Sequence, residues 1–123
     1  MYGFDSQVLV RVIDGVRFRV EAPLAYTSKS GAVFTIPALF VTDFASSYIF
    51  RWNLLSRQAS NSDAAVLHDW LYYTGIVTRA EADKLFLEAL EACGIGIIVR
   101  TKAYWGVRMF GWTAWNYHRK HNG

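Results

Sequence analysis

Cysteine is almost absent from this sequence, which contains only Cys93. A single cysteine excludes an intramolecular disulfide, and it also excludes a structural zinc site built from four cysteines. Packing must therefore stabilise the fold. Long uncharged apolar runs are missing as well, because none reaches the roughly 18 residues that a membrane-spanning helix needs. We therefore expect no transmembrane segment.

The N-terminal stretch MYGFDSQVLV lacks the basic start and the apolar run of a signal peptide. We therefore expect that the chain is not secreted by a signal peptide and is located in the cytoplasm of the producing cell. Delivery inside a larger particle stays open. Common catalytic motifs are also missing: there is no GxSxG turn, no Walker loop and no paired-glutamate site.

Acidic residues are absent from the chain after Glu91, although the formal net charge of the whole sequence is only +3. The same C-terminal segment contains five basic residues: Arg100, Lys102, Arg108, Arg119 and Lys120. A basic segment favours an anionic partner, which can be a lipid head group, a nucleic acid or an acidic protein face.

The length of 123 residues suits a single domain, 1–123. Hydrophobic residues make up 53% of the chain and charged residues only 19%, which argues against disorder. The chain has more hydrophobic residues than a small core can bury, so we expect some of them to form an exposed apolar patch.

Strand patterns fill the first part of the domain, 1–37. Alternating valines around the Asp14-Gly15 turn predict a β-hairpin over 7–21, and Ser30-Gly31 predicts the turn of a second hairpin over 24–37. The segment 38–62 is expected to be an irregular loop.

Helical patterns fill the remainder. A helix pair is predicted over 63–93, with its first helix capped by Asn61-Ser62-Asp63 and its second by a Thr78/Glu81 capping box. One aromatic and basic helix is predicted over 97–118, although its glycines weaken it. Strands first and helices second indicate an α+β fold, with N-terminal antiparallel β-hairpins packed against a C-terminal three-helix unit.

The helix pair contains the residues with the clearest chemical potential. His68 and Tyr72 are four residues apart and so share a helix face, and Asp83 on the second helix can approach His68 across the antiparallel pair. A carboxylate bound to one imidazole nitrogen orients the ring, and the other nitrogen can then take a proton from water. Asp69 is turned aside and can bind a hard cation such as calcium.

Each of these residues also has a structural interpretation. His68 and Asp83 can be a buried polar pair that fixes the register of two helices, because unpaired burial of such groups is costly. Asp43 can be a further metal ligand, or a loop residue that caps backbone amides together with Thr42 and Ser46. A zinc ion held by His68, Asp69 and Asp43 would leave a position open for water and is a third possibility.

The predicted helix 97–118 has aromatic residues on almost every side. Trp and Tyr mixed with Lys and Arg are typical of a membrane interface. The alternative is a core helix that covers the sheet and ends in a solvated basic tail. Base stacking on these rings lacks the signature of any known nucleic-acid module, so nucleic acid is not the expected partner.

Several motifs together resemble a family of short phage and prophage proteins that is known only as a domain of unknown function. They are IP…FVTDFAS over 36–46, AAVLHDWLY over 64–72, Ala82-Asp83 and the YWGVRMFG segment over 104–111. The resemblance implies a viral or prophage origin, and hence production in the cytoplasm of a host bacterium or association with a virion. It implies no established activity. This chain has Ser47-Tyr48 where family members usually have Ile-Pro.

The segments 63–72 and 82–86 are similar to the catalytic helices of phospholipase A2, in particular the disulfide-free type found in parvovirus capsids. The resemblance implies that His68 is the general base and Asp69 the calcium ligand. It implies that Asp83 is the partner of His68, supported by Tyr72. The family's glycine-rich calcium loop has no counterpart here, and Asp43 either replaces it or calcium binding is lost.

Two functions follow as expectations. The first is a phage-encoded, calcium-dependent hydrolase that acts on an ester of a lipid or the cell envelope, with an anionic membrane surface as its partner. The alternative is a non-catalytic virion or tail-assembly component, whose partners are other virion proteins. The zinc arrangement would instead suit cleavage of peptidoglycan.

Overall fold

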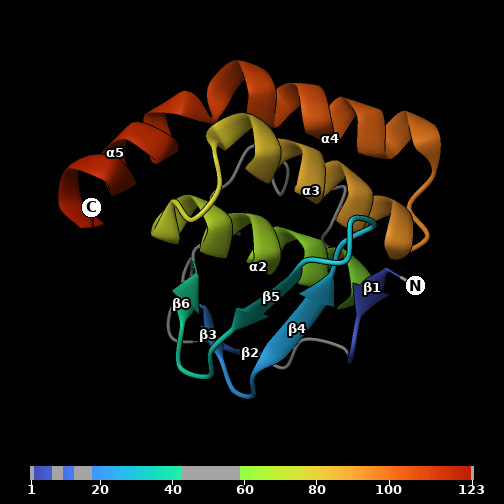
Figure 1. The fold of residues 1–123 in the computed structure, drawn as a ribbon, viewed down its shortest axis with the longest axis horizontal. Coiled ribbons are helices and arrows are strands. Elements are labelled where there is room, and N and C mark those ends of the chain that lie inside the picture. Colours follow the sequence, from blue (N-terminus) through green and yellow to red (C-terminus); the bar gives the residue numbers. More distant parts are fainter. Residues whose placement is uncertain (1, 7–9, 13–17, 43–58, 123) are drawn as a thin grey trace.

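The computed structural model describes residues 2–6, 10–12, 18–42 and 59–122. Within them the chain is α+β, with strands in its first part and helices after them (Figure 1). The strands are β1 (Gly3–Phe4), β2 (Val10–Val12), β3 (Phe18–Val20), β4 (Leu24–Thr27), β5 (Val33–Ile36) and β6 (Val41–Thr42). The helices are α2 (Ala59–Thr74), α3 (Arg79–Ala92), α4 (Ile97–Phe110) and α5 (Trp112–Asn122).

The strands form two small antiparallel sheets, with orders β1-β4-β5 and β2-β3-β6. Both predicted hairpins are confirmed. β4 pairs with β5 from Leu24 opposite Ile36 to Thr27 opposite Val33, and the turn between them contains Gly31 with φ 93°. β2 pairs with β3, whereas the expected Asp14-Gly15 turn lies outside the described residues.

The helices are stacked above the sheets (Figure 1). α2 packs on α3, α3 packs on α4, and α5 returns to α2. The core lies where the sheets meet the helix pair. Its largest fully buried side chains include Tyr26, Leu24 and Ile36 from the first sheet, and Leu67, Leu71, Phe86 and Leu90 from α2 and α3. None of the described helices is long and apolar enough to cross a membrane.

The predicted boundaries of the helix pair are correct for α3 and partly wrong for α2. The capping box is present, since Thr78 Oγ1 accepts from the Glu81 amide and Glu81 Oε1 accepts from the Thr78 amide, both at 3.1 Å. α2 begins at Ala59, so the predicted cap at Asn61–Asp63 was wrong and that segment lies inside the helix. Asp63 is therefore a buried residue within the helix rather than its N-cap. Less of 38–62 is irregular than expected, because β6 and the first turn of α2 fall within it.

The predicted helix over 97–118 is divided at Gly111 into α4 and α5. A Cβ at Gly111 would lie 2.6 Å from the Tyr72 hydroxyl and 2.5 Å from the Val107 carbonyl oxygen. The missing side chain thus allows the junction to pass close to α2. The division turns the chain so that α5 reaches the C-terminal end of α2 (Figure 1).

Replacing Gly111 by alanine is expected to lower the free energy of unfolding by about 2 kcal/mol, because Tyr72 or the helix junction must move. Helix propensity alone predicts the opposite sign, a gain of roughly 1 kcal/mol. Urea denaturation measures the difference. The control is Gly96→Ser at the other end of α4, where the site is open and the N-cap makes no side-chain hydrogen bond. It is expected to stabilise by a few tenths of a kcal/mol, roughly. A stabilised Gly111→Ala protein would contradict the close packing at the junction.

Candidate functional site: a buried aspartate shared by a histidine, a tyrosine and two arginines

The predicted contact across the helix pair is present. His68 and Tyr72 lie one turn apart on α2 and both face Asp83 on α3. His68 Nε2 is 2.8 Å from Asp83 Oδ1, and the Tyr72 hydroxyl donates to the same oxygen at 2.6 Å. Asp83 is fully buried, and His68 is only 8% exposed. The three side chains therefore form one buried polar cluster, in which the carboxylate of Asp83 is the common acceptor.

The second carboxylate oxygen of Asp83 is bound by arginine. Arg108 Nη1 donates to Asp83 Oδ2 at 2.8 Å, and Arg79 Nη1 lies 3.7 Å from the same oxygen. Arg79 also donates to the main-chain carbonyl oxygens of Val107 and Arg108, which ties the start of α3 to the end of α4. The carboxylate is thus divided between two sets of donors, with histidine and tyrosine on one oxygen and arginine on the other.

Sequence reasoning missed both arginines. Arg79 precedes Asp83 by four residues on one helix, so the spacing of favourable ion pairs could have revealed it. Arg108 had no such signal, since it comes from α4, 25 residues away in the chain. In the sequence it belongs to the basic C-terminal segment, which predicts an external anionic partner rather than an ion pair inside the fold.

The cluster keeps Asp83 ionised. Burial by itself acts to raise the pKa of Asp83, but the hydrogen bond and charge of His68, with the hydrogen bonds from Tyr72 and Arg108, outweigh it and lower the pKa. The pKa of Tyr72 is raised, first by burial and then by its hydrogen bond to Asp83. Tyr72 therefore remains a hydrogen-bond donor at neutral pH.

This geometry determines the tautomer of His68. An ionised carboxylate can only accept hydrogen bonds, so in its neutral form the imidazole would carry its proton on Nε2 and present a lone pair on Nδ1. The ring is held on both sides, with centroid distances of 4.3 Å to Tyr72 and 4.7 Å to Phe86. A fixed ring with a lone pair on Nδ1 meets one requirement of general-base catalysis. Access of water and substrate to that nitrogen is a second requirement, and only 8% of His68 is exposed.

α5 supports the cluster from the end of α2. Arg119 Nη2 donates to the main-chain carbonyl oxygens of Tyr72 and Tyr73 at 2.7 and 2.9 Å, where a cation also complements the helix dipole. The guanidinium lies over the ring of Trp115, whose ring in turn meets Tyr72 edge-on at 5.2 Å. Trp115 and Arg119 therefore help to position Tyr72. Neither the membrane-interface interpretation nor the core-helix interpretation of this segment predicted that role.

The predicted metal ligands are not assembled by the described residues. Asp69 is partly buried on α2 beside His68. Asp43, its expected partner for calcium and the third ligand for zinc, lies outside the described residues. Within the described ranges, no three His, Cys, Asp or Glu residues are grouped so that they could hold a metal ion. Calcium takes six to eight oxygen ligands, so the donor set seen here does not by itself fit it.

Cys93 offers no second reactive centre. Burial, together with the nearby charge of Asp63, raises the pKa of its thiol to about 12. The thiolate is the reactive form of cysteine, so this residue is inert at neutral pH.

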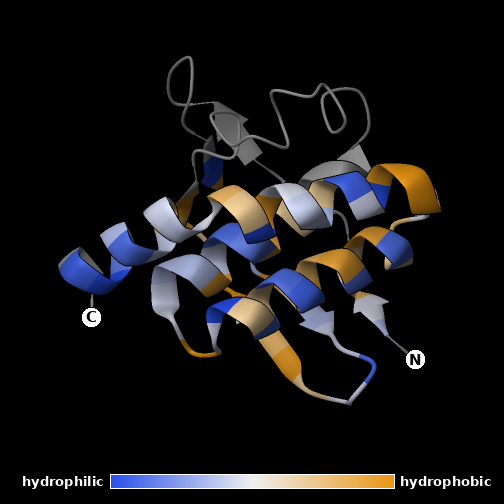
Figure 2. Ribbon diagram, turned by 90° about the horizontal axis from the view of Figure 1, so that it is seen from above, coloured by the Kyte–Doolittle hydropathy of each residue, from blue (hydrophilic) through white to orange (hydrophobic). Residues whose placement is uncertain are grey.

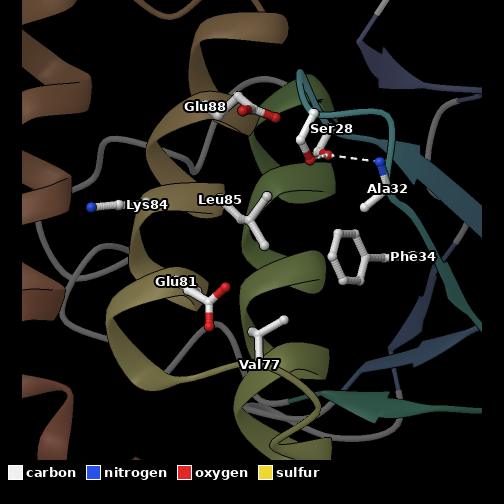
Figure 3. Close-up of a pocket in the computed structure, with 9 residues that line it drawn as sticks. Ser28, Ala32, Phe34, Val77, Glu81, Lys84, Leu85 and Glu88 are labelled. Atoms are coloured by element: carbon white, nitrogen blue, oxygen red, sulfur yellow. Dashed lines mark hydrogen bonds between the residues drawn. The ribbon is translucent and has the colours of Figure 1, made fainter.

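A separate pocket lies between the β4–β5 hairpin and α3 (Figure 3). It has a volume of about 320 Å³ and an apolar floor of Phe34, Val77 and Leu85. Glu88 at its edge accepts from the Tyr26 hydroxyl and from the Lys29 amide, so this carboxylate is already satisfied. None of the three residues of the His68 cluster lines this pocket.

The fold and the cluster define a small α+β domain in which a helix pair encloses a His–Asp contact. The chain belongs to the family described as "Protein of unknown function (DUF1353)", whose model matches residues 18–107. That match runs from β3 almost to the end of α4 and includes His68, Tyr72 and Asp83. Comparisons with curated proteins and with solved structures gave no match.

Proposed function

We propose that the chain is a phage- or prophage-encoded hydrolase of the phospholipase A2 type, which cleaves an ester of a lipid or the cell envelope. The observation that supports this function is the contact between His68 Nε2 and Asp83 Oδ1, with Tyr72 on the same oxygen. The resemblance to phospholipase A2 implies this set of contacts. The viral origin in the proposal depends on the resemblance of the motifs alone.

In the proposed reaction, His68 Nδ1 takes a proton from a water molecule as the water oxygen attacks the ester carbonyl carbon. The positive charge that develops on the imidazole is balanced by Asp83 through Nε2. When the carbon–oxygen bond to the alcohol breaks, the imidazolium returns the proton to the leaving oxygen. The products are a carboxylic acid and an alcohol, and His68 ends in its starting state.

Calcium belongs to the proposal as a cofactor to be tested. Asp69 is the described residue that would contribute a carboxylate, and Asp43 would be the second. A bound cation would polarise the ester carbonyl. Because the described donor set is incomplete, no step of the reaction above depends on it. Zinc is the less favoured metal.

The partner in this proposal is an anionic membrane surface, reached from the cytoplasm of a host bacterium or from a virion. The test uses the wild-type protein with phosphatidylglycerol vesicles, in millimolar calcium and in chelator. Release of fatty acid in calcium, and its loss in chelator, is the expected result. Release that persists in chelator would remove calcium from the proposal, and absence of release in both would end the hydrolase proposal. Metal analysis of the purified protein tests zinc.

A second function is favoured because Asp83 has hydrogen-bond partners for both of its oxygens inside the fold. Asp83 is fully buried and both its oxygens are bound, as expected of a polar contact that fixes the register of two helices. In that case the protein is a non-catalytic virion or tail-assembly component. Co-purification with particles, together with a His68→Ala variant that loses thermal stability and no activity, would support it. Protein found only free of particles would count against it.

A further inference from the structure

The small and the large apolar residues of α4 are distributed in an unusual way. The face that packs on α3 consists of Ala103, Gly106 and Val107, which are all buried. The large side chains point the other way: Ile98 is 69% exposed, Trp105 56% and Met109 62%. A surface helix of a globular domain normally buries its large apolar residues and exposes polar ones.

These exposed residues form one stripe. Positions 98, 105 and 109 are separated by seven and four residues, so they share a face of the helix. Trp112, which is also exposed, lies in the first turn of α5, two residues after the end of α4. Ile98, Lys102, Trp105, Met109 and Trp112 are called the outer face below. Figure 2 views the molecule from this side, with the first turn of α4 in hydrophobic colours and the end of α5 in hydrophilic ones.

The charge on this side has one sign. Neither α4 nor α5 contains an acidic residue. Three of the five basic residues in this segment are bound inside the fold: Arg100 to the carbonyl oxygen of Ile95, Arg108 to Asp83 and Arg119 to the end of α2. Lys102 and Lys120 are exposed and form no ion pair with any described residue. Lys102 lies within the apolar stripe.

We infer that the outer face of α4 binds to an anionic lipid surface, with the helix axis parallel to that surface. Trp side chains suit the boundary between head groups and acyl chains, and lysine extends its ammonium group to lipid phosphates. A second copy of the chain fits less well, because two such faces would bring lysines together with no acidic residue between them. Nucleic acid fits less well because Ile98 and Met109 cannot stack on bases as aromatic rings do.

The choice of a lipid partner rests on the proposed function, but the surface lies on α4 and not at His68. Binding and hydrolysis can therefore fail separately. The experiment measures binding of the whole chain to vesicles by co-sedimentation and by the blue shift of tryptophan fluorescence. Phosphatidylcholine vesicles with and without phosphatidylglycerol are compared in chelator, so that no calcium is involved.

Three variants are matched for this test. Trp105→Ser with Met109→Ser removes two large residues from the outer face, and is expected to weaken binding to anionic vesicles by about 100-fold from the apolar area lost. Lys102→Gln is expected to weaken it about fivefold, as for one cation near the lipid surface. The control Val33→Ser with Ile76→Ser removes two equally exposed apolar residues elsewhere and is expected to bind as wild type does. Urea denaturation establishes that all three are folded.

The expected result is binding that requires phosphatidylglycerol, weakens as salt increases and follows this order of variants. Equal binding to neutral and anionic vesicles would overturn the inference, as would equal weakening by the control. No vesicle binding, combined with a dimer or a nucleic-acid complex that Trp105→Ser with Met109→Ser disrupts, would overturn it in favour of that partner. If binding follows the expected order but the separate assay in millimolar calcium releases no fatty acid, the inference holds and the proposed function fails.

Discussion

Replacing Asp83 by asparagine is expected to lower the free energy of unfolding by about 3 kcal/mol, the lower end of the range for breaking a buried charge pair. The substitution keeps the shape of the side chain but removes its charge. Arg108 and Arg79 are then left beside a neutral group, and the two donors on Oδ1 lose an ionised acceptor. Both arginines are partly exposed, so water can replace some of the interaction, which is why the lower end applies. Urea denaturation at pH 7 measures the change.

The matched control is Glu91→Gln on the same helix. Glu91 also pairs with two cations, at 2.8 Å with Lys29 and at 3.5 Å with Arg100, but its side chain is partly open to solvent. Water and salt screen such a pair, so the expected loss is much smaller than for Asp83→Asn. Equal losses of unfolding free energy for the two variants would show that burial does not strengthen the interactions of Asp83.

The contribution of Asp83 should also depend on pH in one direction. The folded protein lowers the pKa of Asp83 below its ordinary value of 3.8, so the stabilisation is fully present above that value. It is lost as the pH falls through the lower, folded pKa. The difference in unfolding free energy between wild type and Asp83→Asn should therefore shrink once the solution is acidic enough to protonate Asp83. A difference that stays undiminished in strongly acidic solution would contradict an ionised Asp83 in the cluster.

Replacing His68 by alanine is expected to reduce ester hydrolysis about 100-fold or more, because general-base catalysis contributes factors of that size. The same change removes a ring packed between Tyr72 and Phe86 and leaves a buried acceptor with fewer donors. A loss of stability of about 2 kcal/mol is therefore expected as well. Fatty-acid release from anionic vesicles and urea denaturation, measured on the same preparation, separate the two effects.

Tyr72→Phe and Glu91→Gln complete this series. Tyr72→Phe keeps the ring but removes one hydrogen bond to Asp83, which Arg108 still holds, so hydrolysis should fall only about fivefold. Glu91→Gln leaves the cluster intact and should hydrolyse as wild type does. If His68→Ala lost stability but kept all the hydrolytic activity of the wild type, the cluster would be structural and His68 would not be the general base.

Local sequence patterns predicted those parts of the fold that depend on neighbouring residues. The Thr78/Glu81 capping box fixed the start of α3, because each side chain satisfies an amide within three residues. The turn at Ser30-Gly31 fixed the hairpin of β4 and β5 in the same way. The start of α2 was misplaced, because Asn61-Ser62-Asp63 resembles a cap whereas the helix begins before it. A cap motif is therefore only a weak guide to where a helix begins.

Part of the candidate site was also predicted, because it too depends on residues that are close in the sequence. His68 and Tyr72 share a face by helical spacing, and the short connection to α3 brings Asp83 to them, so these three could be named from the sequence. Arg108 could not, since its position depends on how α4 crosses α3. Asp43 lies outside the described residues, and its role stays a prediction.

The sequence by itself determined the α+β class, the helix pair and the contact of His68 with Asp83, because these follow from periodicity and short connections. Only the tertiary structure decided where the C-terminal cations go. Arg108 on α4 binds Asp83, and Gly111 then permits a turn beside Tyr72 that lets Arg119 bind the end of α2. Lys102 remains outside with exposed tryptophans. The physical reason is that a buried carboxylate and the carbonyl end of a helix attract cations from any part of the chain that packing brings near.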